Sequence, residues 1–197
     1  NDLDGLKNGM STAIQNLQAA SNAIEAITNV LEQMRGLTNS ALQESSTSVK
    51  QDLATQFNAL RAQVDMIVDD SIFNGTNLLD DPTTTLTISF SATNATSQLI
   101  VTAANLNADG LLVDNAASDW AASANVLVAQ SQLQTALSTL RTEASNFGSN
   151  STILNTRLDF TTNMITTLQT ASDNLILADT NEEGANLMAL QAKMALS

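Results

Sequence analysis

Apolar and small residues recur at alternating intervals of three and four along the N-terminal part of the chain. These positions are Leu3, Leu6, Met10, Ala13, Leu17, Ala20, Ile24, Ile27, Leu31 and Met34. The spacing is that of the a and d positions of a heptad repeat, and its persistence predicts a long helix packed against partner helices. We expect this helix to run from Asp4 to about Leu42, a length of roughly 60 Å at 1.5 Å per residue.

A second heptad seam follows the polar stretch from Glu44 to Ser48. Its apolar positions are Leu53, Phe57, Leu60, Val64 and Ile67. Ser48 is a candidate N-cap, because its hydroxyl can accept a hydrogen bond from a free backbone N–H in the first turn. The short interruption predicts two antiparallel helices that together occupy residues 1–72.

The helical period is lost after these two helices. Phe73, Asn74 and Gly75 open a turn motif that extends to Leu79, and Pro82 prevents a helix from continuing. Alternation with a period of two follows, at Leu86, Ile88 and Phe90 and then at Leu99, Val101 and Ala103. This pattern predicts a β-hairpin, and its apolar face should pack on the helices because an isolated hairpin is only marginally stable. We expect residues 105–119 to form an irregular connection.

Helical spacing returns at Trp120, which we expect to anchor a third helix that stops near Gly148 and Asn150. The heptad then restarts at Leu154 and predicts a last helix that reaches the end of the chain. The positions expected to form the core seam of the bundle are Leu17, Ile24, Ile27, Leu31, Leu53, Phe57, Val64, Leu137, Leu140, Leu158, Ile165 and Leu168.

The predicted fold class is therefore mainly α. It is an elongated antiparallel helical bundle with heptad packing and a β-hairpin in the middle of the chain. We expect one domain over residues 1–197, with N-terminal helices in 1–72, the turn, hairpin and connection in 73–118, and C-terminal helices in 119–197.

Composition and charge narrow the possible functions. The 197 residues include 43% hydrophobic ones, which suffices for a core, but only 3% aromatic and 14% charged ones. The net charge of −13 repels phosphate backbones and anionic lipids, so we expect neither nucleic acid nor a membrane as a partner. The chain has no Cys and no His, which removes thiolate metal sites, the usual zinc ligand and the usual general base. A structural or assembly role is favoured over an enzyme.

Paired carboxylates are the remaining candidates for chemistry. They occur at Asp69–Asp70, Asp80–Asp81 and Glu182–Glu183, and such pairs can serve a glycosidase or bind a hard cation. Charge clusters are more often solvated faces or helix ends, and the segment around Pro82 lacks the alternating pattern of an EF-hand loop. We assign no catalytic residue, no metal site and no cofactor.

Both the order of these elements and three motifs resemble the core domain of bacterial flagellin. Residues 73–79 (FNGTNLL) resemble the FNG-x-x-LL turn that follows the second N-terminal helix of that family. Residues 31–37 (LEQMRGL) resemble its L-x-x-M/V-R-x-L helix segment, and the NEEGANL sequence at 181–187 resembles the C-terminal region of the alphaproteobacterial branch. The resemblance covers essentially the whole chain.

The resemblance implies a structural subunit of the bacterial flagellar filament. Such a subunit is secreted through the flagellar export apparatus with the help of a chaperone, and it assembles with other flagellin subunits outside the cell for motility. The chain begins at Asn1 without Met, as an excised fragment would. Members of the family carry further terminal segments that polymerise, and we expect these to be missing at both ends here, so that the core is a monomer.

Two alternatives stay open at this level. A hook-filament junction protein shares the helical core, although the FNG turn and the NEEGANL tail favour flagellin. A secreted adhesin-like surface protein would need aromatic binding platforms, and the 5 Phe and 1 Trp offer few.

The resemblance also implies a surface that neighbouring subunits or the vertebrate innate flagellin receptor would contact. It comprises Glu32, Gln33, Leu37, Gln56 and Leu60. Recognised flagellins carry Arg and Glu where this chain has Gln33 and Gln56, whereas Leu37 is retained. We therefore expect weak or no binding to that receptor.

Overall fold

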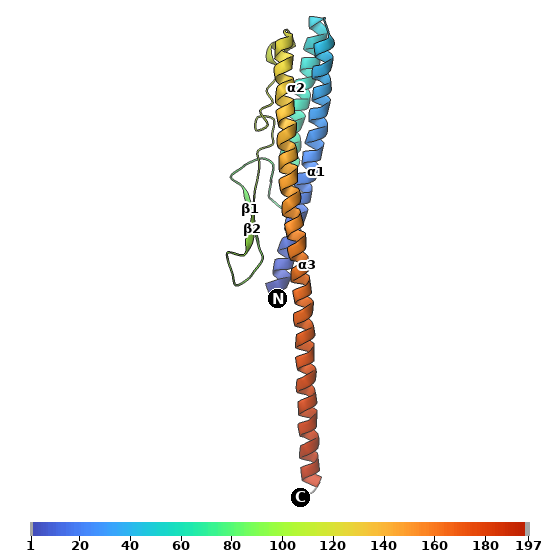
Figure 1. Cartoon of the computed structure of the whole chain (residues 1–197), viewed down its shortest axis with the longest axis vertical. Coiled ribbons are helices and arrows are strands. Elements are labelled where there is room, and N and C mark those ends of the chain that lie inside the picture. The colour runs from blue at the N-terminus through green and yellow to red at the C-terminus, as the bar shows by residue number, and fades with distance from the viewer. Residues whose placement is uncertain (1, 196–197) are drawn as a thin grey trace.

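The computed structural model describes residues 2–195 and is an elongated helical bundle with one hairpin on its side (Figure 1). The elements in chain order are α1 (Asp2–Gln43), α2 (Thr47–Asp70), β1 (Thr85–Ser89), β2 (Gln98–Thr102), the 3-10 helix η1 (Ala117–Trp120) and α3 (Ser123–Ala195). Both α2 and α3 run antiparallel to α1 and pack on it. The predicted class, a mainly helical bundle with a hairpin in mid-chain, is confirmed.

The heptad seam of α1 forms the centre of the core. Buried positions along it are Met10, Ala13, Leu17, Ala20, Ile24, Ile27, Leu31 and Met34. From the other helices, Phe57 and Val64 of α2 and Leu137 and Leu140 of α3 are also buried, while Leu53 and Leu158 are half-buried against the same cluster. Continuous a/d stripes on three helices thus explain why the bundle is long and narrow.

The C-terminal half of the chain is one helix, which corrects the prediction of a stop near Gly148 and Asn150. Both residues lie inside α3, which is 73 residues long. A glycine in a helix costs only about 1 kcal/mol relative to alanine. Phe147 and Leu154 are both buried and stand one heptad apart, so burial of the same face continues across the glycine and outweighs that cost.

The last part of α3 leaves the bundle. Ile165 is the last buried residue along the described part of the helix, and α3 then extends well past the N-terminus of α1 (Figure 1). Leu168 is 52% exposed, so its assignment to the core seam is wrong. The heptad pattern continues there, but α1 begins at Asp2 and no partner helix of the described chain reaches that level.

The turn between α1 and α2 differs in detail from the prediction. The N-cap of α2 is Ser46 rather than Ser48, and its side chain makes no capping hydrogen bond. Instead, a Glu44 carboxylate oxygen accepts hydrogen bonds from the backbone N–H groups of Ser45 and Ser46, each at 2.8 Å. The N–H of Ser46, followed by that of Ser45, lowers the pKa of the Glu44 carboxyl below its ordinary value.

The hairpin lies with its apolar face on α1, as predicted. Leu86 stands opposite Val101 and Ile88 opposite Leu99, and these pairs occupy the inward face. On the other face, Ile100 is exposed. The guanidinium of Arg157 on α3 lies 5.0 Å from the centre of the Phe90 ring, which adds a cation–π contact just beyond β1.

The connection after the hairpin is irregular but contributes to the core. Its buried side chains are Leu106, Ala108, Leu111, Val113 and Ala116. It ends at three consecutive residues with positive φ, from Ser118 to Trp120. Trp120 is fully buried, and its ring meets that of Phe57 edge to face at 4.9 Å, so it anchors the start of α3 as predicted.

Candidate functional surfaces

A groove between α1 and α2 brings together four of the five residues predicted to face a subunit or a receptor. Its lining includes Gln33 and Leu37 from α1 and Gln56 and Leu60 from α2. Both glutamines are exposed and both leucines are half-buried. The groove therefore has an apolar floor between two neutral amides, and it carries no charge at the centre.

Glu32 lies beside this groove rather than in it. Its carboxylate forms an ion pair with the Arg35 guanidinium at 2.7 Å, one turn further along α1. Exposed pairs of this kind contribute at most about 1 kcal/mol.

A second groove lies between α1 and α3. Arg35 and Asn39 line it from α1, and Gln130, Gln134, Leu137 and Arg141 line it from α3. The side chain of Gln130 donates a hydrogen bond to the Asn39 amide oxygen at 2.8 Å, which joins the two helices across the groove. In contrast to the first groove, this one holds two cations.

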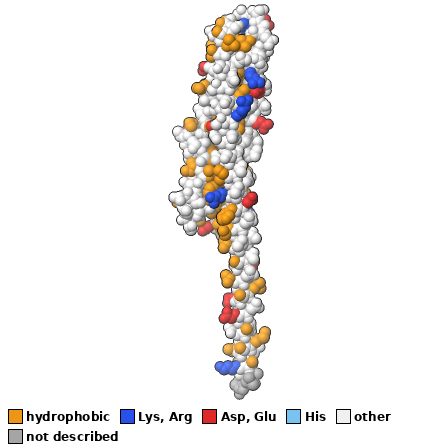
Figure 2. All heavy atoms as spheres, in the orientation of Figure 1, with side chains coloured by type: hydrophobic (Ala, Val, Ile, Leu, Met, Phe, Trp, Pro, Cys, Tyr) orange, Lys and Arg blue, Asp and Glu red, His pale blue; other side chains and the backbone are white. Residues whose placement is uncertain are grey.

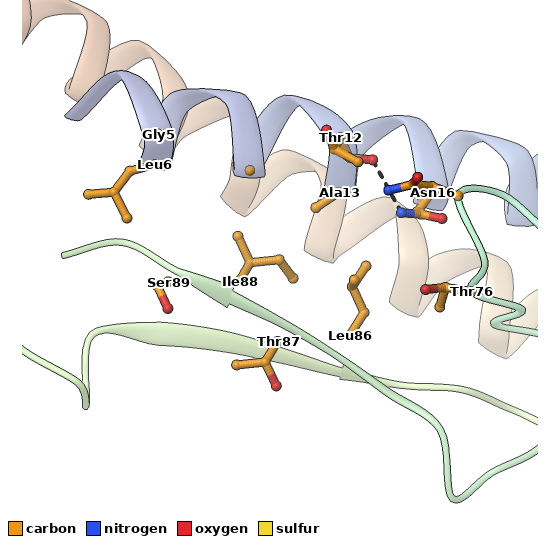
Figure 3. A pocket seen from close by; sticks show the side chains of 12 residues that line it. Gly5, Leu6, Thr12, Ala13, Asn16, Thr76, Leu86, Thr87, Ile88 and Ser89 are labelled. Atoms are coloured by element: carbon orange, nitrogen blue, oxygen red, sulfur yellow. Dashed lines mark hydrogen bonds between the residues drawn. The ribbon is translucent and has the colours of Figure 1, made fainter. Parts of the chain in front are cut away.

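A small cavity lies under the hairpin, between β1 and the first turns of α1 (Figure 3). Leu86 and Ile88 point into it from β1, and Gly5, Gly9 and Ala13 leave it open on the helix side. Its inner wall includes Asn16, which is only 3% exposed and whose amide oxygen has no hydrogen-bond partner among the described residues. Its lining combines small and aliphatic residues with Ser, Thr and Asn side chains and includes no charged residue.

The predicted turn motif adopts the geometry that its sequence requires. Asn74 and Gly75 have φ of 49° and 77°, and Phe73 and Thr76 exchange two backbone hydrogen bonds of 3.0 Å around them. A two-residue turn with positive φ at both positions favours Asn-Gly, since other residues are strained there.

Asn77 fastens this turn to the end of α2. Its side-chain amide donates to the Val68 carbonyl at 2.7 Å, and its oxygen accepts from the Ser71 hydroxyl and the Leu79 N–H, each at 2.9 Å. The two leucines of the motif are buried, and the carbonyl of Leu78 accepts a hydrogen bond from Ala104. The whole motif therefore links the end of α2 to the connection, which is a structural role.

One face of α2 holds the connection in place, and the sequence analysis missed it. Asn58 accepts a hydrogen bond from the Ala116 N–H, and Asp65 accepts one from the Ala108 N–H, both at 2.8 Å. Between them, Arg61 donates to the Val113 carbonyl at 2.8 Å and pairs with Asp65 and Asp109. Polar residues spaced three and four apart beside the apolar seam were the available signal.

The acidic pairs show no sign of a chemical site. Asp69, Asp70, Asp80 and Asp81 are exposed, as are Glu182 and Glu183 on the free part of α3. Within residues 2–195, no three carboxylates gather closely enough to hold a metal ion. The pKa of Asp81 is lowered by the Thr83 backbone N–H and then by the Thr83 hydroxyl, which is the signature of a local turn.

The free part of α3, residues 166–193, exposes many apolar side chains. Seven large ones are each at least 52% exposed: Leu168, Leu175, Ile176, Leu177, Leu187, Met188 and Leu190. Figure 2 shows hydrophobic side chains scattered down this projecting helix. In the described part of the chain, no helix is long and apolar enough to cross a membrane.

A long, narrow helical bundle with open grooves and a projecting helix is typical of a structural protein. Comparison with known proteins agrees with this class. Residues 1–84 match the family model for the bacterial flagellin N-terminal helical region. Flagellin FljM of Caulobacter vibrioides is 33% identical over 198 residues, which cover 98% of this chain and 68% of that protein. Flagellin FljO of the same organism is 31% identical over 201 residues, covering 100% and 71%.

This chain belongs to the bacterial flagellin family. The crystal structure of Bacillus cereus flagellin shares its fold, with a TM-score of 0.67 at 22% identity over 78% of this chain and 88% of that one. The chain is accordingly a structural subunit of the bacterial flagellar filament, an extracellular assembly, and it associates with other flagellin subunits. The family is structural rather than enzymatic, and the relatives in Caulobacter confirm the resemblance to the alphaproteobacterial branch.

Proposed function

We propose that the subunit contacts its neighbours in the filament through two apolar surfaces, the free part of α3 and the α1–α2 groove. The observation that carries the proposal is the set of seven large apolar side chains on residues 166–193, which lie outside the core of their own chain. Apolar surface gains about 25 cal/mol per Å² when it leaves water. Soluble monomers rarely expose such a surface unless it meets a partner.

The α1–α2 groove is the second contact. Leu37 and Leu60 already lie half-buried on its floor, so an apolar side chain of a neighbour needs to displace little water to cover them. Gln33 and Gln56 form a neutral rim that imposes no charge requirement on that neighbour. The bundle, the hairpin and the connection act as one domain that presents this surface, with 1–72, 73–118 and 119–197 as its successive parts.

The composition of the same groove supports the expectation of weak recognition by the innate flagellin receptor. An Arg in place of Gln33 would offer a five-donor planar cation, and Gln offers neither that charge nor that geometry. A Glu in place of Gln56 would offer an anion on the other side. Because both charges are replaced by neutral amides in this chain, we infer that the groove serves the filament and not the receptor.

Export before assembly is the remaining part of the proposal. A chain without Cys cannot be trapped by disulfides, and one with 3% aromatic residues is easily kept unfolded for passage through a narrow channel. The exposed apolar side chains on 166–193 are also a suitable surface for an export chaperone, which would cover them until subunits meet.

The test is assembly of the full-length subunit with Leu187→Ser and Leu190→Ser together. The matched control is Gln191→Ser, on the same exposed stretch of α3. We expect wild-type helix content for both proteins as monomers, but filaments in electron micrographs only from the control. Filaments from the double variant at the wild-type critical concentration would refute the proposal.

A further inference from the structure

The groove between α1 and α3 concentrates positive charge on a strongly acidic chain. The sequence holds 7 basic against 20 acidic residues, and two of those basic residues, Arg35 and Arg141, line this one groove. On the face drawn in Figure 2, basic side chains gather on the upper part of the bundle. The chain as a whole repels acidic surfaces, so this groove is a place where an acidic side chain of a neighbour would meet local positive charge.

Arg141 makes no contact that explains its presence within the subunit. Its side chain has neither an ion pair nor a hydrogen bond with any described residue, and it is exposed. Other cations of the bundle are used internally, since Lys50 donates to the Ser123 hydroxyl at 3.2 Å and Arg61 binds the connection. Arg35 has only its exposed pair with Glu32.

The neutral residues around the two arginines are also hydrogen-bond donors. Asn39 and Gln130 are joined to each other, which fixes their orientation, and Gln134 is exposed on the groove wall. Amide N–H groups beside a guanidinium are the donor set that a carboxylate accepts from, and Arg binds carboxylates in a two-pronged geometry.

We propose that this groove binds carboxylates of a second copy of the chain in the filament. Each subunit brings a surplus of acidic side chains, including the exposed pair Asp69–Asp70 at the end of α2, so the partner chemistry is present in every neighbour. Packing subunits of charge −13 side by side creates repulsion, and a groove that pairs two cations with neighbouring anions offsets part of it. The inference rests on the filament role of the chain and is independent of the two apolar surfaces proposed above.

The first test compares Arg141→Gln with Lys7→Gln in the full-length subunit. Both variants remove one positive charge, but only the first removes it from the groove. We expect the thermal midpoint of the monomer to be unchanged in both, because Arg141 has no partner in its own chain. The critical concentration for filament growth should rise roughly two- to fivefold for Arg141→Gln beyond any change for Lys7→Gln, as expected for one partly exposed ion pair.

Salt dependence separates a specific ion pair from general charge repulsion. Added NaCl screens repulsion between all acidic subunits and therefore promotes assembly, whereas it weakens an attractive pair. The Arg141→Gln protein lacks the attractive pair, so added NaCl should lower its critical concentration more steeply than that of the wild type. Parallel salt curves for the two proteins would count against the groove as an ionic contact.

Crosslinking then identifies the partner. Arg141→Lys keeps the charge and introduces a primary amine, which a carbodiimide can couple directly to a carboxylate in contact with it. We expect peptide mass spectrometry of crosslinked filaments to join position 141 to an Asp or Glu of another subunit, with no such product from wild-type filaments or from monomers.

Two results would overturn the proposal. One is a critical concentration for Arg141→Gln equal to that of Lys7→Gln, with no intersubunit crosslink at position 141. The other is inorganic phosphate binding to the monomer that depends on Arg141 while filament growth does not, which would make the groove a small-anion site. Failure of the wild-type full-length subunit to form filaments at all would instead contradict the filament role.

Discussion

Ile24 and Leu168 both lie on an apolar heptad seam in the sequence but in opposite environments in the structure. Replacing each of them by Asp should therefore have very different effects on stability. Ile24 is 3% exposed in the centre of the bundle, whereas Leu168 is 52% exposed on the free part of α3. Removing a buried Ile side chain costs about 2–5 kcal/mol, and burying an unpaired carboxylate adds several more. Because a domain of this size is stable by about 5–15 kcal/mol, Ile24→Asp should abolish most of the stability or unfold the bundle. Leu168→Asp should change it by no more than about 0.5 kcal/mol.

The assay is urea unfolding followed by the fluorescence of the single Trp. Trp120 is fully buried against Phe57, so its emission reports bundle packing and not the helicity of the free part of α3. Ile24→Val serves as a control for side-chain shape and should cost about 0.5–1.5 kcal/mol. Equal unfolding midpoints for the Ile24→Asp and Leu168→Asp proteins would mean that the assignment of a buried seam on α1 and an exposed end of α3 is mistaken.

Other changes test the turn motif at residues 73–79, the turn between α1 and α2, and the α1–α2 groove. Asn77→Ala removes three hydrogen bonds to α2 and the turn, so it should lower the free energy of unfolding by about 2 kcal/mol in the same urea assay. The pKa of Glu44 is lowered in the fold by the N–H groups of Ser46 and Ser45, so the carboxylate stabilises the fold fully at neutral pH, and this contribution is lost as pH falls below the ordinary pKa of a glutamate. The Glu44→Gln protein should therefore lose less stability on acidification, as thermal melts against pH would show. A reporter-cell assay should find weak signalling by the wild-type chain through the innate flagellin receptor and stronger signalling by the Gln33→Arg, Gln56→Glu double variant. One charge-assisted contact is worth about 2 kcal/mol, or roughly thirtyfold in affinity. Potent signalling by the unmodified chain would refute this expectation.

The hydrophobic periodicity of the sequence predicted those helices and strands in which many equivalent side chains pack in the same way. The heptads of α1 and α2 and the alternation in the hairpin are each supported by many equivalent side chains, so local breakers such as Gly36 did not obscure them. The prediction of a helix end at Gly148 was wrong because a single glycine was given more weight than the heptad register of the apolar residues around it. Phe147, Leu154 and Ile165 lie on one uninterrupted heptad, which was visible in the sequence.

Where the bundle ends could not be predicted from the pattern of α3 itself. The apolar positions continue past Ile165, and whether they are buried depends on the length of the partner helix, which begins only at Asp2. An apolar stripe looks the same whether it meets its own chain or another one. Leu168 was misplaced for this reason.

The candidate grooves were predictable only in part. Gln33, Leu37, Gln56 and Leu60 were identified through the family resemblance, and the structure places them along one groove. Arg141 belongs to none of the motifs recognised in the sequence. Its proximity to Arg35 depends on the pairing of α1 with α3, which is a tertiary relation that no local pattern encodes.

The central claim, that this chain is a filament subunit with its lateral contacts at the two grooves beside α1 and along the free part of α3, is tested most directly by electron cryomicroscopy. The measurement is a helical reconstruction of filaments grown from the full-length subunit. We expect a neighbour to cover Leu37 and Leu60, and we expect Arg141 to lie within ion-pair distance of a neighbour's carboxylate. Filaments in which both grooves face open solvent, or in which residues 166–193 have no neighbour, would contradict the proposed contacts.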